Sequence, residues 1–385
     1  MKLEDIKKIG VVGAGDMGHG IAEVALLAGY KVAMSDIKQE FVDKGLGRIK
    51  ESLAKFVEKQ KITQEAEKAM LASIQTFTDL EKAAKDVDFV IEAAPEILDL
   101  KKKIFANLDK SAPKHAILAS NTSNMSITEI AAATGRPDKV VGIHFFNPAV
   151  LMKLVEYIKG DKTSEETMQL ARDLITKMGK VAVRVEKDSP GFIYNRVNAP
   201  TMIYLGKLLD KWGVNAAEGV DAKMRKLGMP MGPYEIMDFT GLDVGYHSAL
   251  YYADRVSADY KPARWWKELI DANKLGKKTG QGIFDWSKGR PTIDLAKERA
   301  DFDPTDMAAI QVNEATKLLE LGVAKSMDVI DTAMVNGGGS AIGPFQMAKM
   351  IGYEKIVKRL EELAKEFNTD VFKPTKTLVK LSQEK

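Results

Sequence analysis

The chain has 385 residues, of which 45% are hydrophobic and 29% are charged. This length is enough for a buried core and exceeds the usual size of one domain, so we expect two or three domains. The net charge is +3 with lysine and arginine spread along the chain, which argues against a nucleic-acid partner. The absence of cysteine excludes disulfides, thiolate chemistry and cysteine metal ligands. We recognise no signal peptide and no bilayer-length apolar run, and therefore expect a cytoplasmic protein without a membrane partner.

Strand-like and helix-like segments alternate in the first half of the chain. Short, nearly continuous apolar strands are predicted at 8–13, 31–35, 87–93, 115–121, 139–146 and 180–186. This alternation predicts an α/β fold of the Rossmann type, with a doubly wound parallel sheet. The charged stretch 39–85 has a helical period and no strand-like run, so we expect a helical pair there. It is either a solvated arm or a support for a substrate tail.

The second half, after Asp188, has an all-helical pattern and contains a repeat. Residues 219–241 resemble residues 329–352, with Asp221 matching Asp331. The segment 289–304 between the copies is expected to be a linker. The predicted domains are therefore an α/β domain at 1–188, a first helical module at 189–290 and a degenerate second module at 291–385.

A glycine-rich turn follows the first strand. Gly13, Gly15 and Gly18 form a GxGxxG motif between a strand and a helix, and Asp36 ends the second strand 21 residues after Gly15. Such a turn lets a pyrophosphate approach the helix N-terminus, while the acidic residue accepts hydrogen bonds from the adenosine ribose. Because the Asp36 charge would repel a 2′-phosphate, the sequence predicts NAD rather than NADP as the cofactor.

A histidine stands at the end of a later strand, where doubly wound sheets bind their ligands. His144 follows the apolar segment VVGI, and Glu156 lies 12 residues further on, across an Asn-Pro turn. A histidine held by a carboxylate is suited to removing a hydroxyl proton. The other histidines are assigned to structural or solvent-facing roles: His19, His115 and His247. We find no metal-binding spacing and expect no metal.

Together these segments resemble the 3-hydroxyacyl-CoA dehydrogenase family from about residue 6 to 290, and more weakly in the repeat. The resemblance is carried by GAGDMG, IEAAPE, SNTS, HFFNP, the glutamate of MKLVE, SPGFIYNR, GMPMGPYEIMDFTGLD and LGKKTGQG. It implies that His144 is the general base and that Glu156 orients it. It also implies that Ser123 and Asn195 bind the reacting oxygen. Positions near the nicotinamide ribose of the cofactor match Glu96, Lys101, Asn121 and Asn147.

The chain departs from the family pattern in several places. Asn124 replaces the second serine after SNT, and Tyr204 stands where a glutamate is common. The positions that hold the CoA tail match poorly, so Lys44 and Arg48 are candidates for binding it by charge alone.

The resemblance implies NAD-dependent oxidation of an (S)-3-hydroxyacyl-CoA thioester to the 3-oxoacyl-CoA, and the reverse, with a short chain such as 3-hydroxybutyryl-CoA. A related sugar-acid or carnitine dehydrogenase is the alternative, but HFFNP favours acyl-CoA. A non-catalytic, crystallin-like protein is a second alternative, which the intact His144, Glu156, Ser123 and Asn195 disfavour. The second module has no counterpart of SPGFIYNR and is expected to carry no active site.

The duplication also bears on the oligomeric state. Shorter relatives with one helical module form dimers through it. Tethering a second copy favours pairing within one chain, so we expect a monomer containing an internal pseudo-dimer. In the alternative, the repeat only stabilises the fold and a homodimer persists.

Overall fold

The structure is a computed structural model that describes residues 1–338 and 341–384. The chain divides into two compact units. The first contains residues 1–194 and 321–343, and the second contains residues 195–320 and 344–385. The second sequence copy is thus shared between the units, because residues 321–343 belong with the sheet. The predicted boundaries after residues 188 and 290 follow the sequence repeat and stay a prediction.

The first unit is built on an eight-stranded sheet with the order β3-β2-β1-β4-β5-β6-β7-β8. All neighbouring strands are parallel except β6 and β7, which are antiparallel. The central strands are almost entirely buried and apolar, as expected of a sheet covered on both faces. The strands are β1 (Lys8–Val12), β2 (Lys31–Ser35), β3 (Ile74–Phe77), β4 (Phe89–Glu92), β5 (Ile117–Ser120), β6 (Val140–Phe145), β7 (Leu154–Ile158) and β8 (Val181–Val185).

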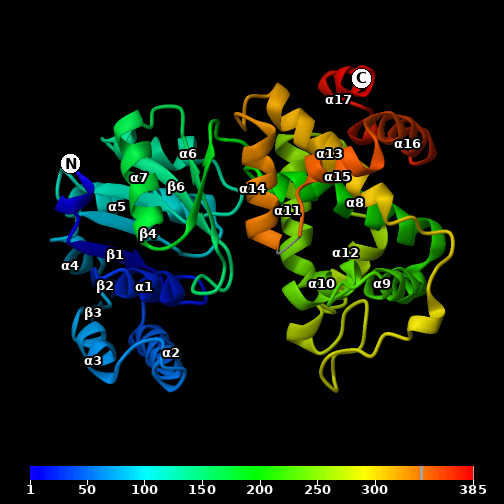
Figure 1. The fold of residues 1–385 in the computed structure, drawn as a ribbon. Coiled ribbons are helices and arrows are strands. Elements are labelled where there is room, and N and C mark those ends of the chain that lie inside the picture. The colour runs from blue at the N-terminus through cyan, green and yellow to red at the C-terminus, as the bar shows by residue number, and fades with distance from the viewer. Residues whose placement is uncertain (339–340, 385) are drawn as a thin grey trace. The chain divides into compact units, whose positions relative to one another are not determined.

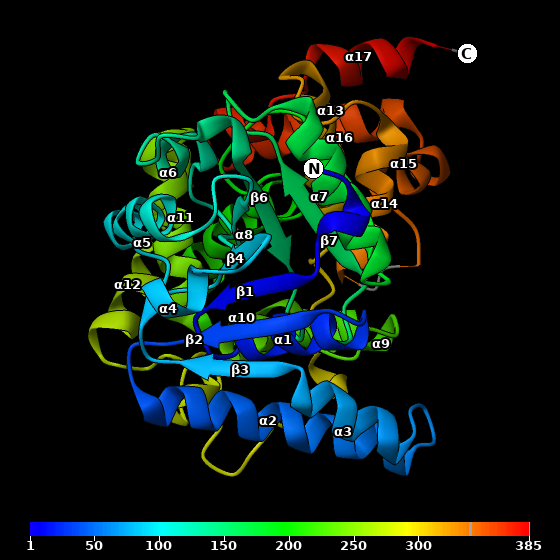
Figure 2. The same cartoon turned by 90° about the vertical axis from the view of Figure 1, so that its left-hand side faces the viewer.

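Helices cover this sheet and extend beyond its edge. Apolar residues of α1 and α7 share one core with alternate residues of the central strands. Helices α2 and α3 lie side by side next to the edge strand β3 (Figure 1 and Figure 2). The helices of this unit are α1 (Gly18–Leu27), α2 (Gln39–Glu58), α3 (Gln64–Ala72), α4 (Leu80–Ala84), α5 (Leu98–Ser111), α6 (Ile127–Ala131), α7 (Glu165–Lys177) and α14 (Met327–Gly338).

Helix α14 comes from the second sequence copy and packs against β7 and β8. A Cβ atom added at Gly337 would stand 2.7 Å from side-chain atoms of both Leu154 and Tyr194. The glycine therefore permits a close approach of this helix to the sheet.

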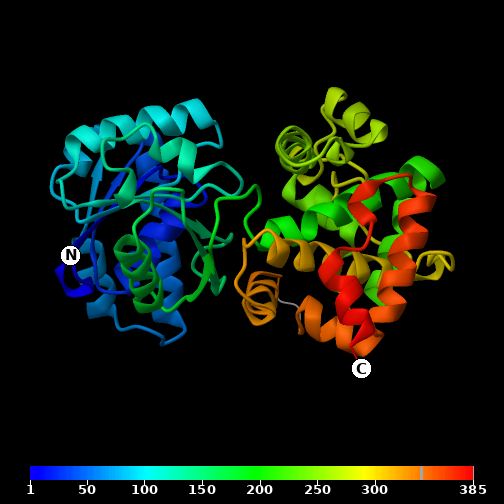
Figure 3. The ribbon, with the colours of Figure 1, turned by 90° about the horizontal axis from the view of Figure 1, so that it is seen from above.

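The second unit is helical, and its core is rich in aromatic residues. The C-terminal helices α16 and α17, red in Figure 3, pack along α13. The helices of this unit are α8 (Tyr194–Trp212), α9 (Ala217–Lys226), α10 (Pro233–Thr240), α11 (Leu242–Arg255), α12 (Arg264–Asp271), α13 (Thr305–Glu320), α15 (Pro344–Ile351), α16 (Tyr353–Glu366) and α17 (Lys376–Gln383).

In both sequence copies an aspartate lies against the glycine that precedes a helix. Asp221 of the first copy is fully buried and accepts hydrogen bonds from the N–H groups of Tyr234 and Glu235 at the start of α10. A Cβ at Gly232, just before this helix, would stand 2.2 Å from the Asp221 carboxyl carbon. In the second copy, a Cβ at Gly343, just before α15, would stand 2.4 Å from the Asp331 carboxyl carbon. These matching contacts explain why aspartate and glycine recur in the repeat.

Two strands were not predicted from the sequence. The stretch 39–85 contains β3, a four-residue edge strand too short and too exposed to stand out from its helical surroundings. The segment around Glu156 is the other missed strand, β7, which pairs antiparallel with β6 at one side of a sheet that is otherwise parallel, as predicted. The segment predicted as a linker packs against the first helical module, because the Arg299 N–H donates to the Gly219 carbonyl and its guanidinium lies over the Trp212 ring.

Candidate active site

The glycine-rich turn has the tight geometry that the motif predicts. Gly13 has φ of +103°, and a Cβ there would stand 2.6 Å from the Ala93 carbonyl oxygen. A Cβ at Gly18 would stand only 1.8 Å from the Gly13 carbonyl oxygen, so the helix can approach the strand only with glycine there. Gly15 differs, since nothing lies within 4 Å of its added Cβ. The turn is therefore closed on its protein side and open at Gly15, which fits a bound pyrophosphate.

Asp36 follows β2 and reaches this turn. Its Oδ2 accepts a hydrogen bond from the Ala14 N–H at 2.7 Å, and its Oδ1 accepts one from the Ile37 N–H at 2.7 Å. The carboxylate is thus held next to the GxGxxG loop, as a ribose-binding residue must be.

The two cationic candidates for the CoA tail lie on α2. Lys44 is exposed. Arg48 forms an ion pair between its Nη1 and the Asp16 Oδ1 within the glycine-rich turn. Gly45 of the same helix packs against Ala14, so α2 supports the cofactor loop directly.

His144 and Glu156 face each other across the antiparallel pair β6 and β7. The His144 Nδ1 lies 2.8 Å from Glu156 Oε2, and the imidazole and the carboxylate are both buried. The second carboxylate oxygen, Oε1, accepts the backbone N–H groups of Ile193 at 3.1 Å and Tyr194 at 2.8 Å. Every oxygen of Glu156 therefore has a donor, which fixes the carboxylate against the imidazole.

Aromatic rings surround this pair. The ring centroids of Phe146 and Phe192 lie 4.4 Å and 5.8 Å from that of His144. Within the described part of the chain, the opposite ring nitrogen, Nε2, has no hydrogen-bond partner. The imidazole is therefore held at Nδ1, and Nε2 can serve as a proton acceptor.

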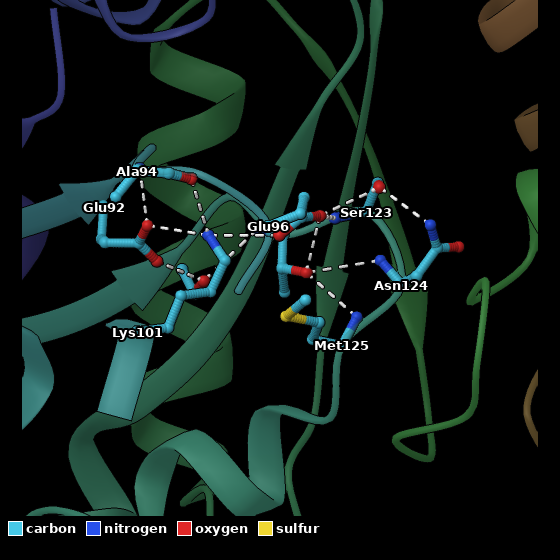
Figure 4. Close-up of polar contacts among 9 residues, drawn as sticks. Glu92, Ala94, Glu96, Lys101, Ser123, Asn124 and Met125 are labelled. Carbon is cyan, nitrogen blue, oxygen red and sulfur yellow. Dashed lines mark hydrogen bonds and ion pairs between the residues drawn. The ribbon is translucent and has the colours of Figure 1, made fainter. Parts of the chain in front are cut away.

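Ser123 lies in the loop after β5 and contacts Glu96 from the loop after β4 (Figure 4). The Ser123 N–H and hydroxyl both donate to Glu96 Oε1, at 2.7 Å and 3.0 Å. The side-chain amide of Asn124 donates to the Ser123 oxygen at 3.1 Å. Glu96 also contacts Lys101, which forms a buried ion pair with Glu92. The sequence reasoning missed Glu92, although a charged residue that ends a buried strand was the available signal.

The three remaining predicted site residues are asparagines from three different segments of the chain. The Asn121 Oδ1 accepts the Phe145 N–H at 2.8 Å, which links the ends of β5 and β6. Asn147 is exposed in the turn after β6, and Asn195 lies in the first turn of α8.

The other histidines have backbone or surface partners. The His19 Nδ1 and the His247 Nδ1 contact the carbonyl oxygens of Gly15 and Asp243. The His115 Nε2 lies 3.0 Å from Asp88 Oδ1, a residue that is distant in sequence and adjacent in space.

The described residues offer neither a metal-binding cluster nor a membrane-spanning helix. Residues 1–338 and 341–384 contain no group of three or more histidine, aspartate or glutamate side chains placed to hold a metal ion. No helix in the same ranges is long and apolar enough to cross a membrane.

A mostly parallel sheet with this glycine-rich turn and an acidic residue at the end of β2 defines the NAD-dependent, Rossmann-type oxidoreductases. The profile described as "3-hydroxyacyl-CoA dehydrogenase, NAD binding domain" matches residues 8–189. That of the "3-hydroxyacyl-CoA dehydrogenase, C-terminal domain" matches twice, at residues 191–286 and 305–385, which confirms the duplication. The chain belongs to the 3-hydroxyacyl-CoA dehydrogenase family and is an NAD-dependent enzyme.

Individual relatives agree with this assignment. A probable 3-hydroxybutyryl-CoA dehydrogenase of Bacillus subtilis is 44% identical over 287 residues, which is 74% of this chain and 99% of the relative. The fatty acid oxidation complex subunit alpha of Psychrobacter cryohalolentis is 37% identical over 94% of this chain and 53% of its own length. The crystal structure of 3-hydroxybutyryl-CoA dehydrogenase from Escherichia coli K12 is similar over 98% of both chains, with a TM-score of 0.88 and 30% identity.

Proposed function

We propose that this enzyme oxidises short-chain (S)-3-hydroxyacyl-CoA thioesters, such as 3-hydroxybutyryl-CoA, with His144 as the general base. The buried hydrogen bond from His144 to Glu156 is the observation that carries the proposal. Relatives named 3-hydroxybutyryl-CoA dehydrogenase support a substrate with a short acyl chain. HFFNP and the family membership together disfavour a sugar-acid or carnitine substrate.

The proposed reaction uses each side of the imidazole differently. Glu156 accepts the Nδ1 proton and so keeps Nε2 free of hydrogen, ready to take the proton of the 3-hydroxyl group. As that O–H bond breaks, the oxygen forms a double bond to C3, and the hydrogen on C3 leaves with its electron pair. Bound NAD supplies the acceptor for this hydride. The imidazolium that forms is stabilised by the Glu156 carboxylate beside it.

The surrounding residues have supporting roles in this proposal. Gly13, Gly15, Gly18 and Asp36 would hold the pyrophosphate and the adenosine ribose, and the Asp36 charge favours NAD over NADP. Ser123 and Asn195 are assigned to the reacting oxygen as hydrogen-bond donors. By the resemblance alone, Asn121 and Asn147 are assigned near the nicotinamide, and Lys44 and Arg48 to the CoA tail.

The test is the His144→Gln variant, assayed with a ladder of acyl-CoA chain lengths. Its kcat should fall by at least about a hundredfold, or roughly 3 kcal/mol, while the dissociation constant for NAD stays within about twofold. His115→Gln is the matched control, because His115 is half exposed and pairs with a surface carboxylate. A His144→Gln variant with nearly normal kcat would exclude this mechanism. Turnover of L-gulonate or carnitine in place of the thioester would exclude the substrate class.

We also propose that the two helical copies pair within one chain, which would make the protein a monomer. They meet along α8 and α13, where the Arg196 Nε lies 2.6 Å from Glu314 Oε1 and the Tyr204 hydroxyl donates to Asp306 Oδ2 at 2.7 Å. All four side chains are buried. Burial and the neighbouring Asp306 carboxylate raise the pKa of Tyr204, so its hydroxyl stays a donor.

The two contacts are related by the repeat. The shift of 110 positions that aligns Asp221 with Asp331 also aligns Arg196 with Asp306. The same shift aligns Tyr204 with Glu314, so each contact is the symmetry counterpart of the other.

The two copies have different residues at these matching positions, which makes each copy complementary to the other copy and not to a second copy of itself. Two first copies would place Arg196 opposite Tyr204, which leaves a buried cation without a carboxylate. Two second copies would place Asp306 opposite Glu314, two buried carboxylates whose cations, Arg359 and Lys317, come from their own copy, so that neither gains a donor from the other copy. Such an arrangement favours the internal pair over a homodimer. The cytoplasmic location and the absence of a nucleic-acid partner stay predictions.

A further inference from the structure

One segment of the second sequence copy belongs to the first unit and is fixed to the end of β8. The Glu186 N–H donates to the Val323 carbonyl oxygen at 2.8 Å, and the Lys187 ammonium donates to the Leu321 carbonyl oxygen at 2.9 Å. Helix α14, which follows this segment, packs against β7 and β8. Because β7 carries Glu156, a helix of the second copy lies against a strand of the candidate active site.

The end of α14 lies against the ring of Tyr194. A Cβ at Gly337 would stand 2.7 Å from the Tyr194 ring atom Cδ2 and 2.7 Å from Leu154 Cδ2. A Cβ at Gly338 would stand 2.7 Å from the Tyr194 hydroxyl oxygen. These distances are well below ordinary van der Waals contact, so a methyl group at either glycine must displace its neighbour. The leucine can rotate its side chain, whereas the tyrosine ring moves only as a rigid body.

Tyr194 reaches the proposed catalytic pair by two routes. Its backbone N–H donates to Glu156 Oε1 at 2.8 Å. Its ring meets the Phe146 ring edge-on, with centroids 5.0 Å apart. Phe146 in turn lies against the His144 imidazole, with centroids 4.4 Å apart. A displacement of Tyr194 would therefore act both on the carboxylate that holds the imidazole and on the ring that packs against it.

The first copy has a different residue at the matching position. The shift of 110 positions that relates the two copies places Leu227 at the position of Gly337. Leu227 lies just after α9 and is 66% exposed. A leucine could not take the place of Gly337, because even a methyl group there collides with the Tyr194 ring. Of the two copies, only the second therefore has the residue that permits this packing.

We infer that α14 of the second copy is a positioning element for the reaction. Gly337 lets this helix hold Tyr194 in place, and Tyr194 in turn fixes the pair of His144 and Glu156. The inference rests on the proposed role of His144 as the general base. The second copy thus supplies no group to the substrate or to NAD, but it supports the residues that carry out the proton transfer.

The test is Gly337→Ala in the full chain. Its kcat should fall about tenfold or more, because the methyl group displaces the Tyr194 ring, while the dissociation constant for NAD changes less than about twofold. In a Tyr194→Ala background the same substitution should cost less than about twofold, because the ring that the methyl displaces is absent. Asn336→Ala is the matched control and should change neither quantity, since the Asn336 amide donates to the Thr332 carbonyl of its own helix.

A gentler variant guards against misfolding. Gly338 is exposed, and its added Cβ collides chiefly with the Tyr194 hydroxyl oxygen. Gly338→Ala should lower kcat about threefold or more, and this loss should shrink to less than about 1.5-fold in a Tyr194→Phe background, which lacks the hydroxyl. Wild-type kcat in both glycine variants, or an equal cost of Gly337→Ala with and without the Tyr194 ring, would overturn the inference alone. The proposed base is tested separately by His144→Gln.

Discussion

Glu156 lies at the same hydrogen-bond distance from Tyr194 as from His144. One carboxylate oxygen lies 2.8 Å from His144 Nδ1, and the oxygen that faces away from the imidazole accepts the Tyr194 N–H at 2.8 Å. Both oxygens of this carboxylate must therefore act as hydrogen-bond acceptors. An amide side chain has one acceptor and one donor, and cannot serve both.

Glu156→Gln should therefore place the hydrogen of His144 on the wrong nitrogen. The amide oxygen will face the backbone N–H groups, because turning its NH₂ toward them would leave buried donors unpaired. The NH₂ then faces Nδ1, which must become an acceptor, and Nε2 carries the hydrogen. We expect kcat to fall by roughly three to four orders of magnitude with little change in NAD affinity. Steady-state kinetics would check this, with the exposed Glu166→Gln as control. Retention of more than a tenth of the wild-type kcat would contradict it.

Two glycines of the same turn should respond in opposite ways to alanine. At Gly15 the added methyl group meets nothing, so Gly15→Ala should keep the wild-type Tm but bind NAD about tenfold more weakly or worse, because the methyl stands where the pyrophosphate approaches. At Gly18 the methyl would collide with the Gly13 carbonyl, and Tm should fall by about 5 °C or more. Thermal unfolding and titration calorimetry measure both. If Gly15→Ala bound NAD normally, the pyrophosphate would have to lie elsewhere.

The pairing of the helical copies predicts a charge-reversal result. Glu314→Arg places two cations together in the core and should lower the free energy of unfolding by about 3 kcal/mol or more. Arg196→Glu combined with Glu314→Arg should recover most of that loss. Urea unfolding of the single and double variants is the measurement. If the double variant were no more stable than the single ones, the two residues would not be paired.

The same pairing predicts the mass in solution. Light scattering should give the 42.4 kDa of one chain. A chain ending at Arg290 lacks the second copy and should not form a specific dimer, because Tyr204 offers no carboxylate to Arg196. Tyr204→Glu in this shortened chain supplies that carboxylate and should restore a dimer. A full chain of twice the mass would contradict the internal pair.

Asp221 should make stability depend on pH. Burial raises its pKa to about 7, against which the hydrogen bonds from Tyr234 and Glu235 act only in part. Between about pH 4 and pH 7 the unfolded chain has released this proton while the folded chain retains it, so the contribution of Asp221 to stability falls as pH rises. The difference in unfolding free energy between wild type and Asp221→Asn should shrink by about 2 kcal/mol from pH 4.5 to pH 7. A constant difference would show that Asp221 keeps an ordinary pKa.

Most strands of the sheet and the glycine-rich cofactor turn could be predicted from the sequence. Strands buried on both faces consist of apolar runs, and the glycines of the turn are required by contacts within a few residues. These signals are local, so the chain order of β1, β2, β4, β5, β6 and β8 could be predicted. β3 gave no such signal, since an edge strand buries little and needs no continuous apolar run.

The contacts that assemble the site were less predictable because they join distant segments. The spacing of His144 and Glu156 suggested a turn between them, but their direct opposition depends on the antiparallel register of β6 and β7. The link from Lys101 to Ser123 passes through two loops and could not be derived from spacing. The role of Tyr204 also required the structure, because its partner Asp306 lies in the other copy of the repeat.

Because Arg196 and Glu314 belong to one chain, their contact should not depend on the enzyme concentration. A dimer loses its partner when its concentration falls below its dissociation constant, and its unfolding temperature then falls with dilution. A pair formed by two segments of one polypeptide has no such threshold. Unfolding midpoint and specific activity should therefore be the same at nanomolar and at micromolar enzyme, and we expect the second copy to keep its neighbour assembled at any concentration.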